Sequence, residues 1–235
     1  MSSTRFAPVA DGAYPTQVHA PYKSTRLRGP LQPPLRIDAP AASMPAVEVS
    51  RKLVSARDAD LTAQGAGAPL GEKIAVAGRV TDEDGRPIAD SLIEVWQCNS
   101  AGRYFHAKDQ HDAPLDPNFF GFGKFLTDAD GRYRFVTIKP AAYPWGNHSN
   151  AWRPAHIHFS LFGNVYAQRL VTQMYFPGDP LHALDPIFNS VPDERARQSL
   201  VARFSIEESI AETMLGYVFD IVLRGRVATP FEQQS

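Results

Sequence analysis

The chain has 235 residues, of which 43% are hydrophobic and 21% are charged, a composition typical of a globular protein with a substantial core. Its one cysteine, Cys98, excludes an intrachain disulfide framework and a structural zinc site built from two or more cysteines of this chain. The 24 basic and 25 acidic residues give a formal net charge of -1, so the composition does not favour nucleic acid or an anionic membrane as a partner.

The first residues carry no continuous apolar stretch behind a basic start, which argues against a secretory signal. No apolar run approaches the roughly 20 residues that a helix needs to cross a bilayer. We therefore expect a cytoplasmic protein.

Residues 1–70 show neither a helical nor a strand period and contain the proline- and glycine-rich stretches GPLQPPL, DAPAASMP and AQGAGAPLG. Such stretches favour irregular or extended backbone. The segment nevertheless keeps apolar and aromatic side chains such as Phe6, Tyr14 and Leu31, which a solvated tail would not need. We expect an extended arm over residues 1–70 that contacts a partner chain, followed by a catalytic domain over residues 71–235.

Alternating apolar residues predict a strand over residues 72–82, where Ile74, Val76 and Val80 share one face. Similar patterns predict further strands within segments 91–98, 123–138, 155–163, 167–176 and 217–225. Within 123–138 the sequence DADG separates two short runs and predicts a β-hairpin. Only residues 193–204 have the pattern of a short surface helix. The expected fold is mostly β, an antiparallel β-sandwich with long functional loops and an irregular N-terminal arm.

Two of the loops between predicted strands are long, residues 98–124 and 139–153, and both are rich in aromatic residues and histidine. Loops of this length on a rigid sheet are usually either functional or disordered. Their aromatic content argues against disorder, so we expect the functional site there.

His156 and His158 lie in the predicted strand AHIHF, where residues two apart point to the same face. Two imidazoles placed in this way can bind one metal ion. The pattern alone is equally compatible with two polar histidines on the exposed face of a sheet.

The segment from Lys139 to Met174 contains no Asp or Glu, so a metal site built on these histidines needs other ligands. Tyr143 and Tyr104, one in each long loop, could supply phenolate oxygens. Deprotonating a tyrosine at pH 7 costs about 4 kcal/mol, which a trivalent cation offsets better than a softer divalent one. Each tyrosine taken singly is more often a half-buried ring with a hydrogen-bonded hydroxyl.

The sequences VWQCNSAGRY, AAYPW, WRPAHIHFSLFG and TQMYFPGDP together resemble the intradiol ring-cleavage dioxygenase family. The resemblance runs from about Gly71 to FDIVLRG and more loosely through PYKST in the arm. It implies one non-haem Fe(III) per chain and four protein ligands: Tyr104, Tyr143, His156 and His158. It also implies catalytic roles for Tyr143, as the phenolate that leaves the iron when a catechol binds, and for Arg153, beside the bound ring.

The same resemblance implies four substrate-binding residues: Tyr22, Trp145, Gln173 and Ile187. Gln173 matches a residue that lines the oxygen pocket, and Phe125 matches a pocket position that is smaller in some relatives. From sequence alone, packing roles for Trp145, Gln173 and Ile187 remain open. The alternative role for Arg153 is a salt bridge at the edge of a sheet. No Asp or Glu lies near it in the sequence to form that salt bridge.

Within the family the resemblance is greatest to the iron-bearing β chains that cleave protocatechuate (3,4-dihydroxybenzoate) with O₂ to 3-carboxy-cis,cis-muconate. It implies an α chain as partner, in an αβ protomer of a larger oligomer, and a small aromatic diol as substrate.

One alternative function is that of a catechol or hydroxyquinol 1,2-dioxygenase. Those enzymes have a helical dimerisation segment, however, and residues 1–70 contain too many prolines to form one. A remote alternative is a metal-free β-sandwich binding module, which would be colourless where a ferric tyrosinate protein is burgundy.

Overall fold

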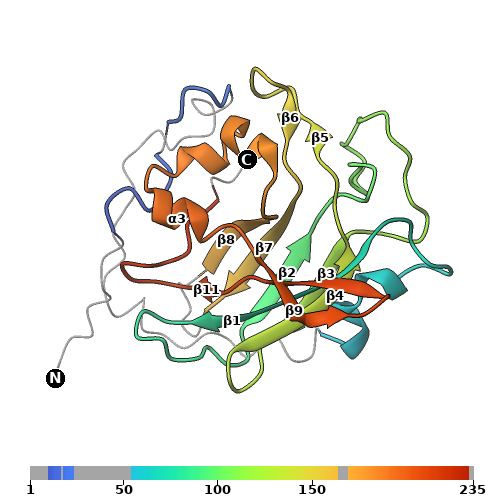
Figure 1. Ribbon diagram of the computed structural model, residues 1–235, viewed down its shortest axis with the longest axis horizontal. Coiled ribbons are helices and arrows are strands. Elements are labelled where there is room, and N and C mark those ends of the chain that lie inside the picture. Colours follow the sequence, from blue (N-terminus) through green and yellow to red (C-terminus); the bar gives the residue numbers. More distant parts are fainter. Residues whose placement is uncertain (1–9, 17, 24–53, 164–168, 233–235) are drawn as a thin grey trace.

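The computed structural model describes residues 10–16, 18–23, 54–163 and 169–232, which form two β-sheets and the loops around them (Figure 1). In the first sheet β1 (Lys73–Thr81) pairs antiparallel with β4 (Arg132–Ile138) and parallel with β10 (Met214–Val218) and β11 (Ile221–Val222). The strand β9 (Arg203–Ile210) lies at the edge, antiparallel to β10.

The second sheet is antiparallel throughout and has the order β3-β2-β7-β8. Its strands are β3 (Phe122–Leu126), β2 (Leu92–Trp96), β7 (His156–Phe162) and β8 (Arg169–Tyr175). A short ribbon of β5 (Tyr143–Pro144) and β6 (Trp152–Arg153) stands in the loop that precedes β7. The predicted sandwich is therefore confirmed, and the first sheet adds parallel pairs to the antiparallel ones.

The helices among the described residues are short. The α-helix α3 (Glu194–Gln198) begins where the Asp193 side chain accepts a hydrogen bond from the Ala196 amide. The 3₁₀ turns are η2 (Ala56–Ala59), η3 (Leu61–Ala63), η4 (Pro180–Leu184) and η5 (Phe188–Ser190). Among the described residues no helix combines the length and the apolar character needed to span a membrane. The predicted helix over 193–204 is shorter than expected, because the chain turns into β9, which the sequence analysis did not predict.

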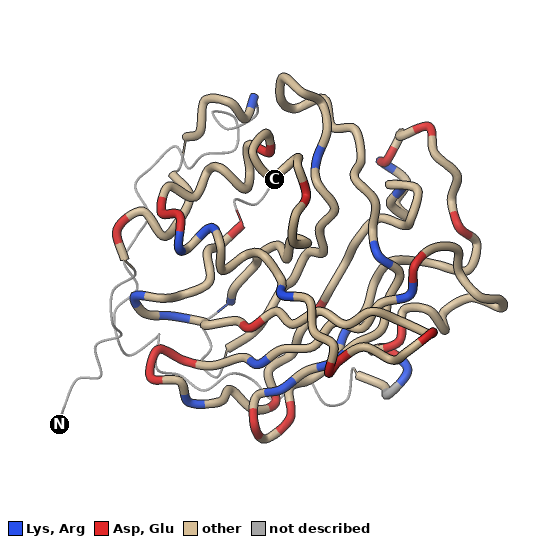
Figure 2. The backbone as a smooth tube through the Cα atoms, in the orientation of Figure 1, with Lys and Arg blue, Asp and Glu red and all other residues tan. Residues whose placement is uncertain are grey.

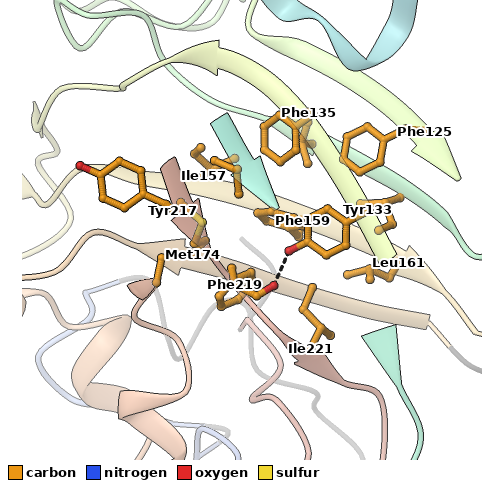
Figure 3. Close-up of a cluster of buried hydrophobic side chains, with 14 of the residues drawn as sticks. Phe125, Tyr133, Phe135, Ile157, Phe159, Leu161, Met174, Tyr217, Phe219 and Ile221 are labelled. Atoms are coloured by element: carbon orange, nitrogen blue, oxygen red, sulfur yellow. Dashed lines mark hydrogen bonds between the residues drawn. The ribbon is translucent and has the colours of Figure 1, made fainter. Parts of the chain in front are cut away.

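The predicted hairpin over residues 123–138 is wrong. Asp128 does form the expected turn, since its side chain accepts hydrogen bonds from the backbone amides of Asp130 and Arg132. The two strands then separate, because β3 pairs with β2 and β4 pairs with β1 in the other sheet. Phe125 of β3 and Phe135 of β4 stack with their ring centroids 5.1 Å apart in the core between the sheets (Figure 3). Burying both rings in that core favours two layers over one ribbon.

The core between the sheets also sets the orientation of β7. Ile157, Phe159 and Leu161 are fully buried and belong to the hydrophobic core that both sheets share (Figure 3). Because side chains alternate along a strand, His156 and His158 point to the opposite face of the same strand. That face is also covered, since both histidines are buried.

Two parts of the expected arm reach the body of the protein. Leu61 is fully buried in the shared core, and Tyr22 is 2% exposed beside the Trp145 ring, at a centroid distance of 5.2 Å. Lys23 donates a backbone hydrogen bond to the Asn147 carbonyl. The expected boundary at residue 70 stays a prediction, and residues 1–9, 17 and 24–53 of the arm lie outside the described residues.

Acidic and basic residues are interspersed along the described chain (Figure 2). Several of them form local ion pairs at the surface, such as Arg134 with Glu208 and Arg203 with Asp220. Exposed pairs of this kind contribute little to stability. The pair formed by Arg153 and Asp185 differs, because both side chains are buried.

Candidate active site

A cavity of about 570 Å³ opens beside the second sheet, where the two long loops meet β7 and β8. Most of the predicted site residues line it: Tyr104, Tyr143, Trp145, Arg153, His158, Gln173 and Ile187. His156 lies directly behind this lining, because its ring centroid is 4.8 Å from that of His158. The structure thus brings together residues that are far apart in the chain.

The two histidines of β7 have the same arrangement of hydrogen bonds, with the Nδ1 atom of each ring facing an acceptor. His156 Nδ1 lies 2.7 Å from the Pro154 carbonyl oxygen, and His158 Nδ1 lies 3.0 Å from Glu232 Oε2. Both partners are acceptors, so each Nδ1 carries the proton and donates it. The Nε2 atom of each ring consequently carries a lone pair, and that of His156 also lies 3.1 Å from Arg153 Nη1, from which it accepts.

Both tyrosine hydroxyls lie at those lone pairs. Tyr104 OH is 3.1 Å from His158 Nε2, and Tyr143 OH is 3.5 Å from His156 Nε2. The two phenol rings meet edge to face with centroids 5.4 Å apart. The Tyr104 backbone is held by the Asp109 carboxylate, which accepts from its amide, while Tyr143 is paired with Arg153 in the β5–β6 ribbon.

Burial shapes the protonation of this group. It raises the pKa of Tyr143 and, with the neighbouring Tyr143 phenol adding to it, raises the pKa of Tyr104 well above the ordinary range. Burial, together with the charge of Arg153 and the neighbouring His158, holds the pKa of His156 well below its ordinary value. At neutral pH His156 is therefore neutral, and both phenols keep their protons unless a cation compensates their charge.

Two phenol oxygens and two imidazole nitrogens form a donor set that fits a hard, highly charged cation such as Fe(III). Such a cation supplies the positive charge that two buried phenolates need. The part of the chain that the structure describes contains no group of three or more His, Cys, Asp or Glu side chains suited to a metal. A metal at this position would therefore rely on the tyrosines.

Arg153 lies beside this group and is almost completely buried. Its Nη1 is 3.1 Å from His156 Nε2, and its Nη2 donates to Gln173 Oε1 at 2.7 Å. Asp185 accepts from Nη2 at 2.8 Å and from Nε at 3.2 Å. No carboxylate near Arg153 in the sequence pairs with it, as expected. Its partner is Asp185, 32 residues further along the chain, so Arg153 does form a salt bridge, and it is a buried one.

Three of the four predicted substrate residues line the same cavity: Trp145, Gln173 and Ile187. The Arg153 guanidinium carbon lies 5.4 Å from the Trp145 ring centroid, which is cation–π distance, and Ile187 is buried in the cavity wall. Gln173 Nε2 is buried and has no hydrogen-bond partner among the described residues. Tyr22 stands behind Trp145 and does not line the cavity.

Phe125 is not part of the cavity, in contrast to the expectation. It stacks on Tyr133 and Phe135 in the core between the sheets (Figure 3). The reason is the period of β3, since Phe125 belongs to the inward-facing set of that strand together with Gly123. It therefore has no bearing on pocket width.

The residues of the site that were missed from the sequence include Trp96, Asp185 and Glu232. Trp96 stacks on His158 with centroids 4.8 Å apart and an angle of 5° between the rings. Its position at the end of a predicted strand was a usable signal. Asp185 and Glu232 are single carboxylates in irregular segments, which no local pattern distinguishes from surface residues.

Comparison with known proteins shows which family has this sequence. The family model described as Dioxygenase matches residues 48–225, which is most of the chain. The chain belongs to the intradiol dioxygenase family. It is 56% identical over 223 residues to a protocatechuate 3,4-dioxygenase beta chain of Burkholderia cepacia, and the alignment covers 94% of each protein.

More distant relatives fit this membership. A protocatechuate 3,4-dioxygenase alpha chain of Pseudomonas putida is 31% identical over 164 residues, which are 68% of this chain and 76% of that one. The crystal structure of a 3-chlorocatechol 1,2-dioxygenase of Rhodococcus opacus 1CP superposes with a TM-score of 0.56 at 25% identity, covering 85% of this chain and 71% of that chain. The intradiol dioxygenase family membership predicted from the motifs is confirmed.

Proposed function

We propose that this chain is the iron-bearing β chain of a protocatechuate 3,4-dioxygenase. It would cleave protocatechuate with O₂ to 3-carboxy-cis,cis-muconate, so that both oxygen atoms enter the product. The observation that carries the proposal is the meeting of two tyrosine hydroxyls with two histidine Nε2 atoms, at 3.1 and 3.5 Å, in the wall of the cavity. The high identity to a relative with that name supports the choice of substrate.

In this proposal Tyr104, Tyr143, His156 and His158 hold one non-haem Fe(III). The ion would supply Lewis acidity toward the two oxygens of an aromatic diol. The burial that keeps the two phenols protonated in the absence of a cation would make their oxygens strong anionic ligands in its presence.

The substrate has two hydroxyl protons, and at least one of them needs an acceptor among the side chains of the site. A Tyr143 phenolate is suited to accept it, because its oxygen lies in the cavity wall and a phenol regains its proton readily once it leaves a cation. Tyr143 stands on a ribbon of two-residue strands, and its hydroxyl is the more distant of the two from its histidine. Tyr104 is the closer one and would remain as a ligand.

Arg153 would stabilise negative charge that develops on the substrate ring. Its guanidinium is permanently charged, and the acceptors that hold it in place include two oxygens of Asp185, the side-chain oxygen of Gln173 and the Tyr175 hydroxyl. Trp145 and Ile187 would contact the faces of the ring, with Tyr22 supporting Trp145 from behind. A fixed charge acts more strongly on a developing anion in the protein interior than in bulk water.

The proposal includes an α chain as partner, within a larger oligomer. It is supported by the relatives named as beta and alpha chains and by apolar side chains left exposed on the β9–β10 hairpin: Phe204, Ile206, Ile210 and Leu215. Co-expression with the α gene product should give a stable complex on size-exclusion chromatography. A fully active monomer of this chain alone would contradict this part.

The deciding experiment is a visible spectrum of the purified protein with a measurement of its iron content. A burgundy colour with one iron per chain, which shifts when protocatechuate is added without oxygen, supports the proposal. A colourless protein without iron would instead support a metal-free binding module. The values of kcat/KM for protocatechuate, catechol and hydroxyquinol then separate the proposal from its alternative, a 1,2-dioxygenase like the 3-chlorocatechol enzyme that shares the fold.

A further inference from the structure

The last described residues of the chain run along β8 and end at the cavity. The amide of Glu232 donates to the Val171 carbonyl at 2.6 Å, and Thr172 Oγ1 donates to the Pro230 carbonyl at 2.7 Å. Ala228 and Thr229 are each 2% exposed. This C-terminal strap, residues 228–232, is therefore fixed to the second sheet by hydrogen bonds and by burial.

The strap carries one carboxylate into the site. Glu232 Oε2 lies 3.0 Å from His158 Nδ1, and the two side chains are only 8% and 11% exposed. Trp96 stacks on the His158 ring at a centroid distance of 4.8 Å and nearly parallel to it. The ring plane is thus set by Trp96, and the rotation of the ring within that plane is set by Glu232.

We infer that Glu232 is a positioning residue that prepares His158 as a metal ligand. By accepting the Nδ1 proton, its carboxylate selects the tautomer whose Nε2 lone pair faces the Tyr104 hydroxyl at 3.1 Å. A carboxylate in this position also makes the imidazole a stronger electron donor. The inference rests on the proposed function, since it assumes a metal ion at this lone pair.

The two histidines differ in the acceptor of the Nδ1 proton. His156 donates its Nδ1 proton to the neutral carbonyl oxygen of Pro154, whereas His158 donates to a charged carboxylate from a distant segment. The Pro154 contact is part of the backbone of the strand entry and comes with the fold. The Glu232 contact requires the strap, so it can be removed without altering β7.

The test uses the full chain in complex with its partner and loaded with iron. Glu232→Gln keeps the size and a hydrogen-bond acceptor but removes the charge, and Glu232→Ala removes the contact. Iron loss to an excess of chelator is followed by the decay of the visible absorption. We expect loss to be about tenfold faster for Glu232→Gln and up to about 100-fold faster for Glu232→Ala, the range typical of groups that orient metal ligands. Glu194→Gln on α3, which is exposed, is the matched control and should behave as the wild type.

Two further measurements separate positioning from a purely structural role. The melting temperature of the iron-free protein should be the same in the wild type and in Glu232→Gln. In the iron-free wild type, ¹⁵N NMR of the His158 ring should show a protonated Nδ1 and an unprotonated Nε2, a measurement that needs no variant to fold.

Equal rates of iron loss in the wild type and both Glu232 variants would overturn the inference, and so would the opposite tautomer of His158. A melting temperature that falls in the iron-free Glu232→Gln protein, in step with its iron loss, would show that the strap only supports the fold. A wild-type protein that binds no iron would overturn the proposed function itself, and this inference with it.

Discussion

Asp185 accepts two hydrogen bonds from the guanidinium of Arg153, one at Oδ2 from Nη2 at 2.8 Å and one at Oδ1 from Nε at 3.2 Å. The two side chains are 0% and 2% exposed. The Tyr175 hydroxyl also accepts from Arg153, and it lies within donating distance of Gln173 Oε1, at 2.7 Å, and of Asp185 Oδ2, at 3.1 Å. A guanidinium held at so many points cannot turn away from the histidines, so the cavity keeps a positive charge at a fixed place.

Replacing Asp185 with asparagine should destabilise the protein strongly. The change leaves the buried Arg153 charge without a counter-ion, which typically lowers the free energy of unfolding by about 3–5 kcal/mol. Urea unfolding at pH 7 measures the effect. Asp220→Asn is the control, because its partner Arg203 is exposed, and breaking an exposed pair should cost less than about 1 kcal/mol. Equal effects of both changes would contradict the role assigned to the buried pair.

The same pair predicts how stability depends on pH. Burial by itself would raise the pKa of Asp185, but the Arg153 guanidinium outweighs it and holds that pKa below its ordinary value of 3.8. The pair therefore stabilises the fold fully above about pH 4, and this contribution is lost as the pH falls through the lowered pKa. The difference in unfolding free energy between the wild type and Asp185→Asn should be constant from pH 7 to about pH 5 and shrink below pH 4. A difference that grows toward acid would show that Asp185 is protonated in the folded protein.

Much of the fold could be predicted because its strands carry a clear two-residue period. The strand over residues 72–82 and the placement of His156 and His158 on one face followed directly from that period. The pairing of the strands could not be predicted from that period, and the turn at Asp128 shows why. A turn sequence fixes the reversal of the chain, while the burial of Phe125 and Phe135 in a common core decides which sheet each strand joins.

The residues of the candidate site also fall into those that the sequence could predict and those that it could not. Tyr104, Tyr143 and Arg153 were found through motifs in the two long loops, and the structure brings them together with the histidines. Asp185 and Glu232 were missed because they act on these residues from segments far away in the chain. Only tertiary structure shows which buried cation or imidazole a distant carboxylate meets.

Removing the Tyr143 hydroxyl should separate iron binding from substrate binding. In Tyr143→Phe three of the four proposed ligands remain, so the protein should keep its iron while its visible absorption weakens. Binding of protocatechuate should slow by about 100-fold, the contribution typical of a well-placed proton acceptor. Stopped-flow mixing without oxygen measures this rate, with Tyr104→Phe for comparison, which should lose iron more readily. Loss of both the iron and the fold in Tyr143→Phe would mean that Tyr143 serves packing alone.

Gly78 should tolerate no side chain. A Cβ at this position would collide with the Phe219 carbonyl oxygen and approach the Tyr133 hydroxyl, and the two segments are held together by backbone hydrogen bonds. Gly78→Ala should therefore lower the free energy of unfolding by about 3 kcal/mol, at the upper end of overpacking effects. Gly146→Ala, where the added carbon meets open space, should leave the melting temperature nearly unchanged. A stable Gly78→Ala protein would show that β1 and the segment at Phe219 can move apart.

The parallel pairing of β1 with β10 places Ile74 opposite Leu215. The ribosome therefore synthesises β1 long before its neighbour β10. While the ribosome is still translating the segment between them, that edge of β1 stays open in the nascent chain. An open edge is a template for wrong pairing, and contacts between distant residues form slowly. Efficient production of this enzyme should therefore depend on chaperones that shield the unfinished sheet, and on a rate of synthesis that does not stall before β10 emerges.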